Sequence, residues 1–178
     1  MTFKDDKYCV VRNVCDTKDL WKHIKSIMSE GDANDTQVIG SPSFYKDVEV
    51  CKMQIKLMPL IEKTTGLKLY PTYTYNRIYV PGAILPTHLD RPACEISVTL
   101  CAGYEGNHSW PIWITDPITK DSTAYMLEPG DMAIYRGCEV EHYREKYTGV
   151  LHGAVFLHYV DQEGPYRDCI YDIKEVIV

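Results

Sequence analysis

The chain has 178 residues, with 19 basic and 25 acidic side chains and a net charge of −6. This length suffices for one domain with a full hydrophobic core but is short for two. The acidic balance disfavours nucleic acid as a partner, because a long phosphate-tracking surface needs an excess of basic side chains. No apolar stretch approaches the roughly 18 residues of a membrane span, and the first residues lack the apolar segment of a signal peptide. We therefore expect a cytoplasmic protein without a membrane segment.

The cysteines also indicate a reducing compartment. Their number is odd and no pair has the Cys-x-x-Cys spacing; they are Cys9, Cys15, Cys51, Cys94, Cys101, Cys138 and Cys169. Such usage fits free thiols better than a disulfide framework or a zinc knuckle. We expect most of them to lie in the core.

Two amphipathic helices are predicted before residue 67. The first begins at Asp16 or Thr17 and ends near Glu30, and the second runs from about Val48 to Thr65, despite Pro59. Apolar residues repeat at helical spacing in both, and a glycine follows each helix. His23 falls on the polar side of the first helix, where we expect it only to face solvent.

From Leu67 onward the sequence is typical of β structure. It is rich in Tyr, Val, Ile and Thr, and turn signals interrupt it at Pro81-Gly82, Ala102-Gly103, Asp116-Pro117 and Pro129-Gly130. Strands are expected at about 73–80, 97–100, 132–135 and 152–158. The predicted fold class is mainly β with N-terminal helices: one domain over 1–178, with a helical part at about 1–66 and a β core at about 67–178.

A His-x-Asp pair, His88 and Asp90, lies in a strand-like stretch, and His142 lies on a later one. Residues i and i+2 of an extended strand point to the same face, so His88 and Asp90 can reach one metal ion. Two imidazoles and one carboxylate form the facial triad that binds Fe(II) and leaves positions open for a cosubstrate and dioxygen. The pattern predicts an oxygenase; a solvated turn without metal is the alternative for the pair alone.

The motifs around these residues resemble the prolyl 4-hydroxylase-like branch of the Fe(II)- and 2-oxoglutarate-dependent oxygenases. In order they are Tyr79-x-Pro81-Gly82, His88-x-Asp90, Pro129-Gly130-Asp131 and His142, and they extend over about residues 70 to 161. The resemblance implies a double-stranded β-helix, a jelly-roll barrel buttressed by two or so α-helices. It also implies that His88, Asp90 and His142 bind Fe(II), with 2-oxoglutarate and O2 as cosubstrates and ascorbate as an optional reductant.

The reaction implied by the resemblance is hydroxylation of an unactivated C–H bond, with release of succinate and CO2. A prolyl residue of a peptide or protein is one candidate substrate, and a free amino acid or another small molecule is the other. A different function class stays open: a cupin-like jelly roll that binds a metal and a sugar or small ligand without redox turnover. A third option pairs Cys138 with His142 as nucleophile and base.

One position departs from the family pattern. A Lys or Arg that binds the far carboxylate of 2-oxoglutarate is expected about ten residues after the distal histidine, where this chain has His152. We expect Arg77 to replace it, because Arg77 shares strand parity with Tyr79. Arg144, two residues after His142, is the second choice, and a protonated His152 is the third.

Further side chains complete the expected site. Matching the family, Tyr79 and Thr99 donate hydroxyl hydrogen bonds to 2-oxoglutarate. The other histidines fit the order of the distal ligand less well than His142; they are His23, His108, His152 and His158. Three aromatic residues are expected to pack in the core or at its rim rather than to bind substrate: Trp110, Trp113 and Tyr125.

Overall fold

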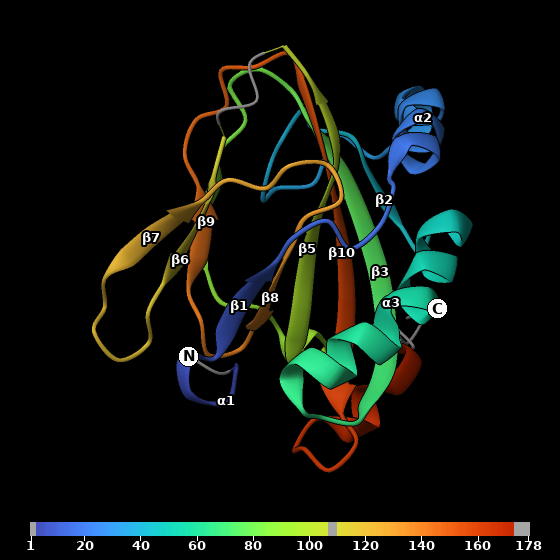
Figure 1. The fold of residues 1–178 in the computed structure, drawn as a ribbon. Helices are drawn as coiled ribbons and strands as arrows, with labels where there is room; N and C mark the ends of the chain where they lie inside the picture. Colours follow the sequence, from blue (N-terminus) through green and yellow to red (C-terminus); the bar gives the residue numbers. More distant parts are fainter. Residues whose placement is uncertain (1–2, 107–109, 173–178) are drawn as a thin grey trace.

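Two antiparallel β-sheets packed against each other form the body of the molecule in the computed structural model, which describes residues 3–106 and 110–172 (Figure 1). The six-stranded sheet has the order β1-β8-β5-β10-β3-β2, and the four-stranded sheet has the order β4-β9-β6-β7. The strands are β1 (Tyr8–Val11), β2 (Ser43–Tyr45), β3 (Leu69–Tyr79), β4 (Leu85–His88), β5 (Ile96–Glu105), β6 (Ile112–Thr115), β7 (Ser122–Tyr125), β8 (Met132–Arg136), β9 (His142–Arg144) and β10 (Leu151–Asp161). This architecture is the predicted jelly roll.

Alternation along each strand divides the core into two layers. On β10, Val155 and Leu157 face outward and join the large apolar cluster beneath the helices, whereas Ala154 and Phe156 face the four-stranded sheet. Because side chains of a strand alternate between faces, His152 and His158 share the inward face with Ala154. The polar residues of the predicted site thus lie between the two sheets.

The predicted helices are confirmed. The first region forms α2 (Lys18–Ser26) and a 3₁₀ turn, η1 (Met28–Glu30), and the second forms α3 (Val48–Thr65). Asp47 caps α3 by accepting hydrogen bonds from the amides of Glu49 and Val50, and Gly66 ends it with a left-handed φ of 74°. Both helices cover the side of the six-stranded sheet that faces away from the four-stranded sheet (Figure 1). Short helical segments complete the described chain: α1 (Phe3–Asp6), η2 (Pro92–Cys94) and η3 (Arg167–Asp172).

The sequence predicted a purely helical part before residue 67, but the structure also has two strands there. β1 pairs with β8, with Tyr8 opposite Tyr135, and β2 pairs with β3, with Ser43 opposite Arg77. These strands have only four and three residues, too few for a clear alternation of apolar and polar side chains.

The predicted turn at Ala102-Gly103 is wrong, because both residues lie inside β5. Gly103 is opposite Gly153 at a register shift between β5 and β10. A Cβ atom at either glycine would lie 2.5 Å from the Trp21 indole. These glycines therefore let Trp21 of α2 pack directly on the sheet, which is a packing role and not a turn.

All seven cysteines are free thiols, as expected. The expectation that most lie in the core is wrong, because only Cys94 and Cys101 are buried and the other five are partly exposed. No helix in the described part of the chain is long and apolar enough to cross a membrane.

Candidate metal and cosubstrate site

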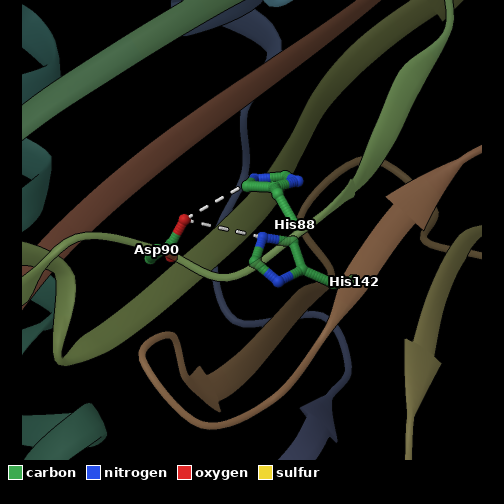
Figure 2. A group of neighbouring side chains, drawn as sticks. All are labelled: His88, Asp90 and His142. Atoms are coloured by element: carbon green, nitrogen blue, oxygen red, sulfur yellow. Dashed lines mark ion pairs between the residues drawn. The ribbon is translucent and has the colours of Figure 1, made fainter.

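Strand pairing brings the two predicted histidine ligands together. His88, the last residue of β4, lies directly opposite His142, the first residue of β9. Side chains of directly opposed residues on an antiparallel pair are neighbours, and the two ring centroids are 4.3 Å apart. Figure 2 shows both rings turned toward Asp90, whose Oδ1 is 3.6 Å from His88 Nε2 and 3.7 Å from His142 Nε2.

Asp90 lies just beyond β4 rather than within it, which corrects the expected strand position of the pair. Its amide still donates to the carbonyl of Gly137 at 2.8 Å, so the backbone continues alongside the segment that leads to β9. The approach is close: a Cβ atom on Gly137 would lie 2.4 Å from Asp90 Oδ2. Glycine at position 137 therefore makes room for the carboxylate.

The hydrogen bonds of the two imidazoles fix which nitrogen can bind a metal. His88 Nδ1 lies 2.8 Å from the carbonyl oxygen of Pro86, and His142 Nδ1 lies 3.0 Å from that of Val140. A carbonyl only accepts, so each Nδ1 carries the hydrogen and each Nε2 presents a lone pair. Burial lowers the pKa of His142, against the raising effect of Asp90, which favours the neutral ring that ligation requires.

A second layer holds the carboxylate of Asp90. Ser97 on β5 donates from Oγ to Asp90 Oδ2 at 2.6 Å, and His158 Nδ1 lies 3.0 Å from the same Oγ. Burial lowers the pKa of His158 to about 4, so this histidine is neutral and can donate to Ser97 from Nδ1. The chain of contacts leaves Asp90 Oδ1 directed toward the two Nε2 atoms.

The three side chains form a donor set that fits Fe(II). One ligand atom from each of His88, Asp90 and His142 lies within 4.8 Å of the others. Two neutral imidazoles and one carboxylate are the facial set used by non-haem iron, and the ion could meet all three without rearrangement of the strands.

Deeper between the sheets, four polar side chains surround the ring of Trp110. The guanidinium carbon of Arg144 lies 4.7 Å from the indole ring, and Tyr79 and Tyr147 each lie 4.7 Å from it between centroids. His152 is 5.2 Å from the same ring. Trp110 itself is buried and donates from Nε1 to the carbonyl of Glu145. It packs in the core, as expected, and its ring contacts the polar side chains of this inner region.

Arg144 is a buried cation without a carboxylate partner among the described residues. Its side chain is 2 % exposed, Nη1 donates to the carbonyl of Trp110 at 2.9 Å, and Nε has no partner. Burial lowers the pKa of Arg144, and the groups that counter this effect are Tyr79, Cys101 and Tyr135, none of them an acid that is ionised at neutral pH. An unpaired buried charge is costly, so this position is suited to an anion.

Unsatisfied hydroxyl groups lie in the same inner region. The Tyr79 and Tyr147 hydroxyls and Thr99 Oγ1 are buried without a hydrogen-bond partner. Thr99 follows Ser97 by two residues on β5, so both point between the sheets. Buried polar groups are normally satisfied, and several orphans beside a buried cation indicate a polar ligand.

Arg77, the anchor favoured by the sequence, has a different environment. It faces inward next to Tyr79, as strand parity predicts, with its guanidinium carbon 5.7 Å from the Tyr79 ring. Its Nη2 donates to Asp35 Oδ2 at 2.5 Å and lies 2.6 Å from the Tyr75 hydroxyl. The charge of Arg77 is thus already balanced within the protein, whereas that of Arg144 is not.

A cavity of about 310 Å³ lies beside the metal-ligand candidates and Arg77. Its walls include the triad His88, Asp90 and His142 together with Arg77 and Arg91. Arg91 makes two hydrogen bonds with the Asp172 carboxylate, at 2.8 and 2.6 Å, so its charge is also balanced. The cavity reaches the metal-ligand cluster and can admit a substrate.

The remaining histidine candidates lie elsewhere or support the site indirectly. His23 bonds to Asp47, the cap of α3, at 2.9 Å and thereby links the two helices, so the expectation that it only faces solvent is wrong. His158 lies behind Asp90, and His108 lies outside the described residues.

The nucleophile option is not supported. Cys138 points its Sγ toward the carbonyl of Arg91, and burial raises the pKa of this thiol to about 11, so little thiolate forms at neutral pH. Trp113 stacks on Tyr143, and Tyr125 packs against Tyr8, which agrees with their expected packing roles.

Sequence reasoning missed Tyr135, Tyr147 and Asp35. Tyr135 lies 4.4 Å from His142 between ring centroids, and burial raises its pKa above the usual range. The alternation of β8 could have revealed it, because Tyr135 shares its face with Ala133, which is paired with Thr99. Tyr147 and Asp35 lie in irregular segments, where no periodic pattern indicates which way a side chain points.

Neither protein-family models nor curated proteins give a match to this sequence. Solved structures do match the fold. A prolyl-4-hydroxylase from Pseudomonas putida has a TM-score of 0.70 at 14% identity, over 89% of this chain and 95% of that one. HygX from Streptomyces hygroscopicus, solved with nickel, 2-oxoglutarate and hygromycin B, has a TM-score of 0.69 at 9% identity, over 90% and 85% of the chains. A Trichoplax adhaerens prolyl hydroxylase, in complex with a hypoxia inducible factor peptide fragment, has a TM-score of 0.68 at 11% identity, over 90% and 86%.

The chain therefore has the double-stranded β-helix fold of the Fe(II)- and 2-oxoglutarate-dependent oxygenases. Identities this low show the fold alone, and the same fold holds proteins that act on different substrates.

Proposed function

We propose that this protein is an Fe(II)- and 2-oxoglutarate-dependent dioxygenase that hydroxylates an unactivated C–H bond. The observation that carries the proposal is the buried guanidinium of Arg144, without a carboxylate partner among the described residues, near a His-Asp-His cluster. Arg144 follows His142 by two residues on β9, so both side chains point between the sheets. A metal ligand set and an anion site on the same face of one strand suit a 2-oxo acid, which chelates a metal at one end and has a carboxylate at the other.

His88, Asp90 and His142 would hold the iron. A facial set of three protein ligands leaves positions for the cosubstrate and O2. Bound iron and 2-oxoglutarate would supply the oxidising chemistry, with succinate and CO2 as by-products and ascorbate as an optional reductant.

Arg144 would bind the far carboxylate of 2-oxoglutarate, in place of the basic residue that the family has at position 152. Thr99 and Tyr79 offer buried hydroxyl groups for the same ligand, and the ring of His152 lies near that of Tyr79. Charge-assisted hydrogen bonds to a buried carboxylate are roughly twice as strong as neutral ones, so they orient the cosubstrate firmly. Trp110 and Tyr147 pack around this region and would keep water from it.

The substrate is less constrained than the cosubstrate. A prolyl residue of a peptide is one candidate, because two of the fold neighbours are prolyl hydroxylases. A small molecule is the other, because HygX was solved with hygromycin B bound. Seven free thiols fit a reducing compartment such as the cytoplasm, and we propose that the two sheets and their helices act there as one catalytic domain.

The experiment that tests this proposal measures 2-oxoglutarate affinity in the wild type, Arg144→Met and Arg77→Met. Truncating one partner of a buried charge pair costs roughly 2 to 5 kcal/mol, which is well over tenfold in affinity. We expect Arg144→Met to lose at least tenfold and Arg77→Met to stay within a few-fold of the wild type. Circular dichroism would verify that each variant is folded.

If only Arg77→Met lost 2-oxoglutarate affinity, the residue that binds the far carboxylate would be Arg77. Normal affinity in both folded variants would reject a charged anchor, and no binding by the folded wild type would reject the cosubstrate itself. The cupin-like function would then be favoured.

A further inference from the structure

We propose that the substrate is a free amino acid, or a zwitterion of the same kind, and that Arg77 binds its carboxylate while Asp35 binds its ammonium group. This inference rests on the proposed dioxygenase function and names the substrate class of the same site. It follows from the charges on the cavity wall, from the open hydrogen-bonding position of Arg77 and from the size of the cavity.

Arg77 is rigidly held and has donors to spare. Its side chain is 1% exposed, yet it lines the cavity that contains the triad, and its guanidinium lies over the Tyr75 and Tyr79 rings. Nη2 is used by Asp35 and Tyr75, but Nε has no partner and Nη1 has only a long contact of 3.5 Å with Gln37. A small movement of the exposed Gln37 side chain would free Nη1 to donate a charge-assisted hydrogen bond to a ligand carboxylate.

Arg77 differs in this respect from the other cationic groups near the metal cluster. Arg91 also lines the cavity, but Asp172 binds it through two hydrogen bonds and the Tyr73 ring covers it at 4.5 Å. Arg144 does not line the cavity and is assigned to the cosubstrate. Both Nη groups of Arg91 are thus engaged by one carboxylate and its plane is covered by a ring, whereas Nη1 of Arg77 has only the long contact with Gln37, so we assign the substrate carboxylate to Arg77.

Asp35 sets the charge of the ligand. Its carboxylate is beside Arg77 on the same wall, with 29% of the side chain exposed. Burial raises the pKa of Asp35, but hydrogen bonds from Tyr75, the Gln37 amide and Arg77 outweigh burial. The pKa is therefore lowered overall, and the carboxyl group is ionised at neutral pH. A simple carboxylate ligand would meet this negative charge and be repelled, whereas a zwitterion places its ammonium group there.

The shape of the cavity favours a small molecule over a peptide. Its volume of about 310 Å³ is at the lower end of ordinary ligand pockets. Two ion pairs tie its wall to irregular segments, Arg77 to residues 31–42 through Asp35 and Arg91 to η3 through Asp172. A free amino acid matches a cavity of this size, with one charged pair on either side of it.

The test measures succinate formation from 2-oxoglutarate by the Fe(II)-loaded wild type, with the common L-amino acids as probes. Each active amino acid is compared with its amide, its N-acetyl derivative and a proline-containing peptide. We expect at least one free amino acid to stimulate turnover, and blocking either charged group to lower kcat/KM at least tenfold. This comparison needs no variant, so it does not depend on whether a variant folds.

Variants then assign the residues. Arg77→Met should lower kcat/KM for the active amino acid at least tenfold and should make the free and amidated forms nearly equivalent. Asp35→Asn should do the same for the free and N-acetylated forms. Isothermal titration of the anaerobic Fe(II) and 2-oxoglutarate complex gives the corresponding loss of binding without turnover. Arg136→Met is the matched control, because Arg136 is a partly buried, ion-paired arginine outside the cavity wall, and it should change neither quantity.

The proposal is overturned if amides, N-acetyl derivatives or peptides act as well as the free amino acid, or if Arg77→Met keeps the same discrimination. It is also overturned if no amino acid stimulates an enzyme that binds 2-oxoglutarate and forms succinate slowly without substrate. Absence of both 2-oxoglutarate binding and succinate formation would instead reject the dioxygenase function, so the two failures are distinguishable.

Discussion

Among single residues, Asp90 is the proposed metal ligand whose position depends on the hydrogen bond of a neighbour. It lies beyond the end of β4, where no ladder fixes its side chain, and Ser97 holds its Oδ2 at 2.6 Å. Residues that orient metal ligands in this way typically contribute about 10- to 100-fold to metal affinity. We therefore propose that Ser97 acts on the metal site through Asp90 and not as a ligand itself.

We predict that Ser97→Ala lowers Fe(II) affinity about 10- to 100-fold, because the Asp90 carboxylate can then rotate away from the two histidines. Competition with a chelator under anaerobic conditions measures this affinity. Ser122→Ala is the control, because Ser122 and its hydrogen-bond partner Thr115 both lie on the four-stranded sheet, away from Asp90. Equal Fe(II) affinity in the wild type and Ser97→Ala would show that Asp90 is held by other contacts.

The site residues differ in how readily the sequence reveals them. His88, Asp90 and His142 were predicted from their chemistry and from the order of motifs in the family they resemble. Tyr79 and Thr99 were predicted by matching the same family. The choice between Arg77 and Arg144 could not be made in this way, because both side chains point inward. It depends on Asp35, a loop residue distant in sequence that balances the charge of Arg77 alone.

Among the elements, the short strand β1 shows how a sequence motif acts in the fold. Asp131, the last residue of the Pro129-Gly130-Asp131 motif, accepts hydrogen bonds from Arg12 Nη1 at 2.7 Å and from the Asn13 amide at 2.8 Å. Its Oδ2 also accepts from the Glu128 amide at 3.0 Å. The motif thus fixes the end of β1 to the start of β8, which the sequence alone did not indicate.

We predict that Asp131→Asn destabilises the protein by about 1 to 3 kcal/mol at pH 7, since it removes the charge and one acceptor from this network. Burial raises the pKa of Asp131, but the bonds from Arg12, Asn13 and Glu128 outweigh this effect and lower it. A lowered pKa stabilises the fold above the unfolded-state pKa near 4, and this stabilisation is lost as the pH falls toward the folded-state value.

Urea unfolding of the wild type and Asp131→Asn between pH 7 and pH 3 measures this effect. The difference in unfolding free energy should be constant from pH 7 to about pH 5 and should shrink below about pH 4. A difference that is the same at all these pH values would show that the charge of Asp131 is not involved.

For the whole molecule, the long periodic elements were predictable and the short ones were not. α3 and the strands β3, β5, β8 and β10 have strong patterns, because each buries one face or both. β1 and β2 have few residues and depend on strands far away in the sequence. Gly103 was read as a turn because its partner Trp21 could not be known, and only tertiary packing shows why a glycine is needed there.

The central claim is that the His-Asp-His cluster binds Fe(II) together with 2-oxoglutarate, and anaerobic titration tests it most directly. Fe(II) is added to the metal-free protein, then 2-oxoglutarate, and the visible spectrum is recorded at each step. We predict a charge-transfer band that appears only after 2-oxoglutarate is added, is absent in Asp90→Ala, and needs at least tenfold more 2-oxoglutarate in Arg144→Met. A folded wild-type protein that binds Fe(II) but gives no such band would contradict the claim.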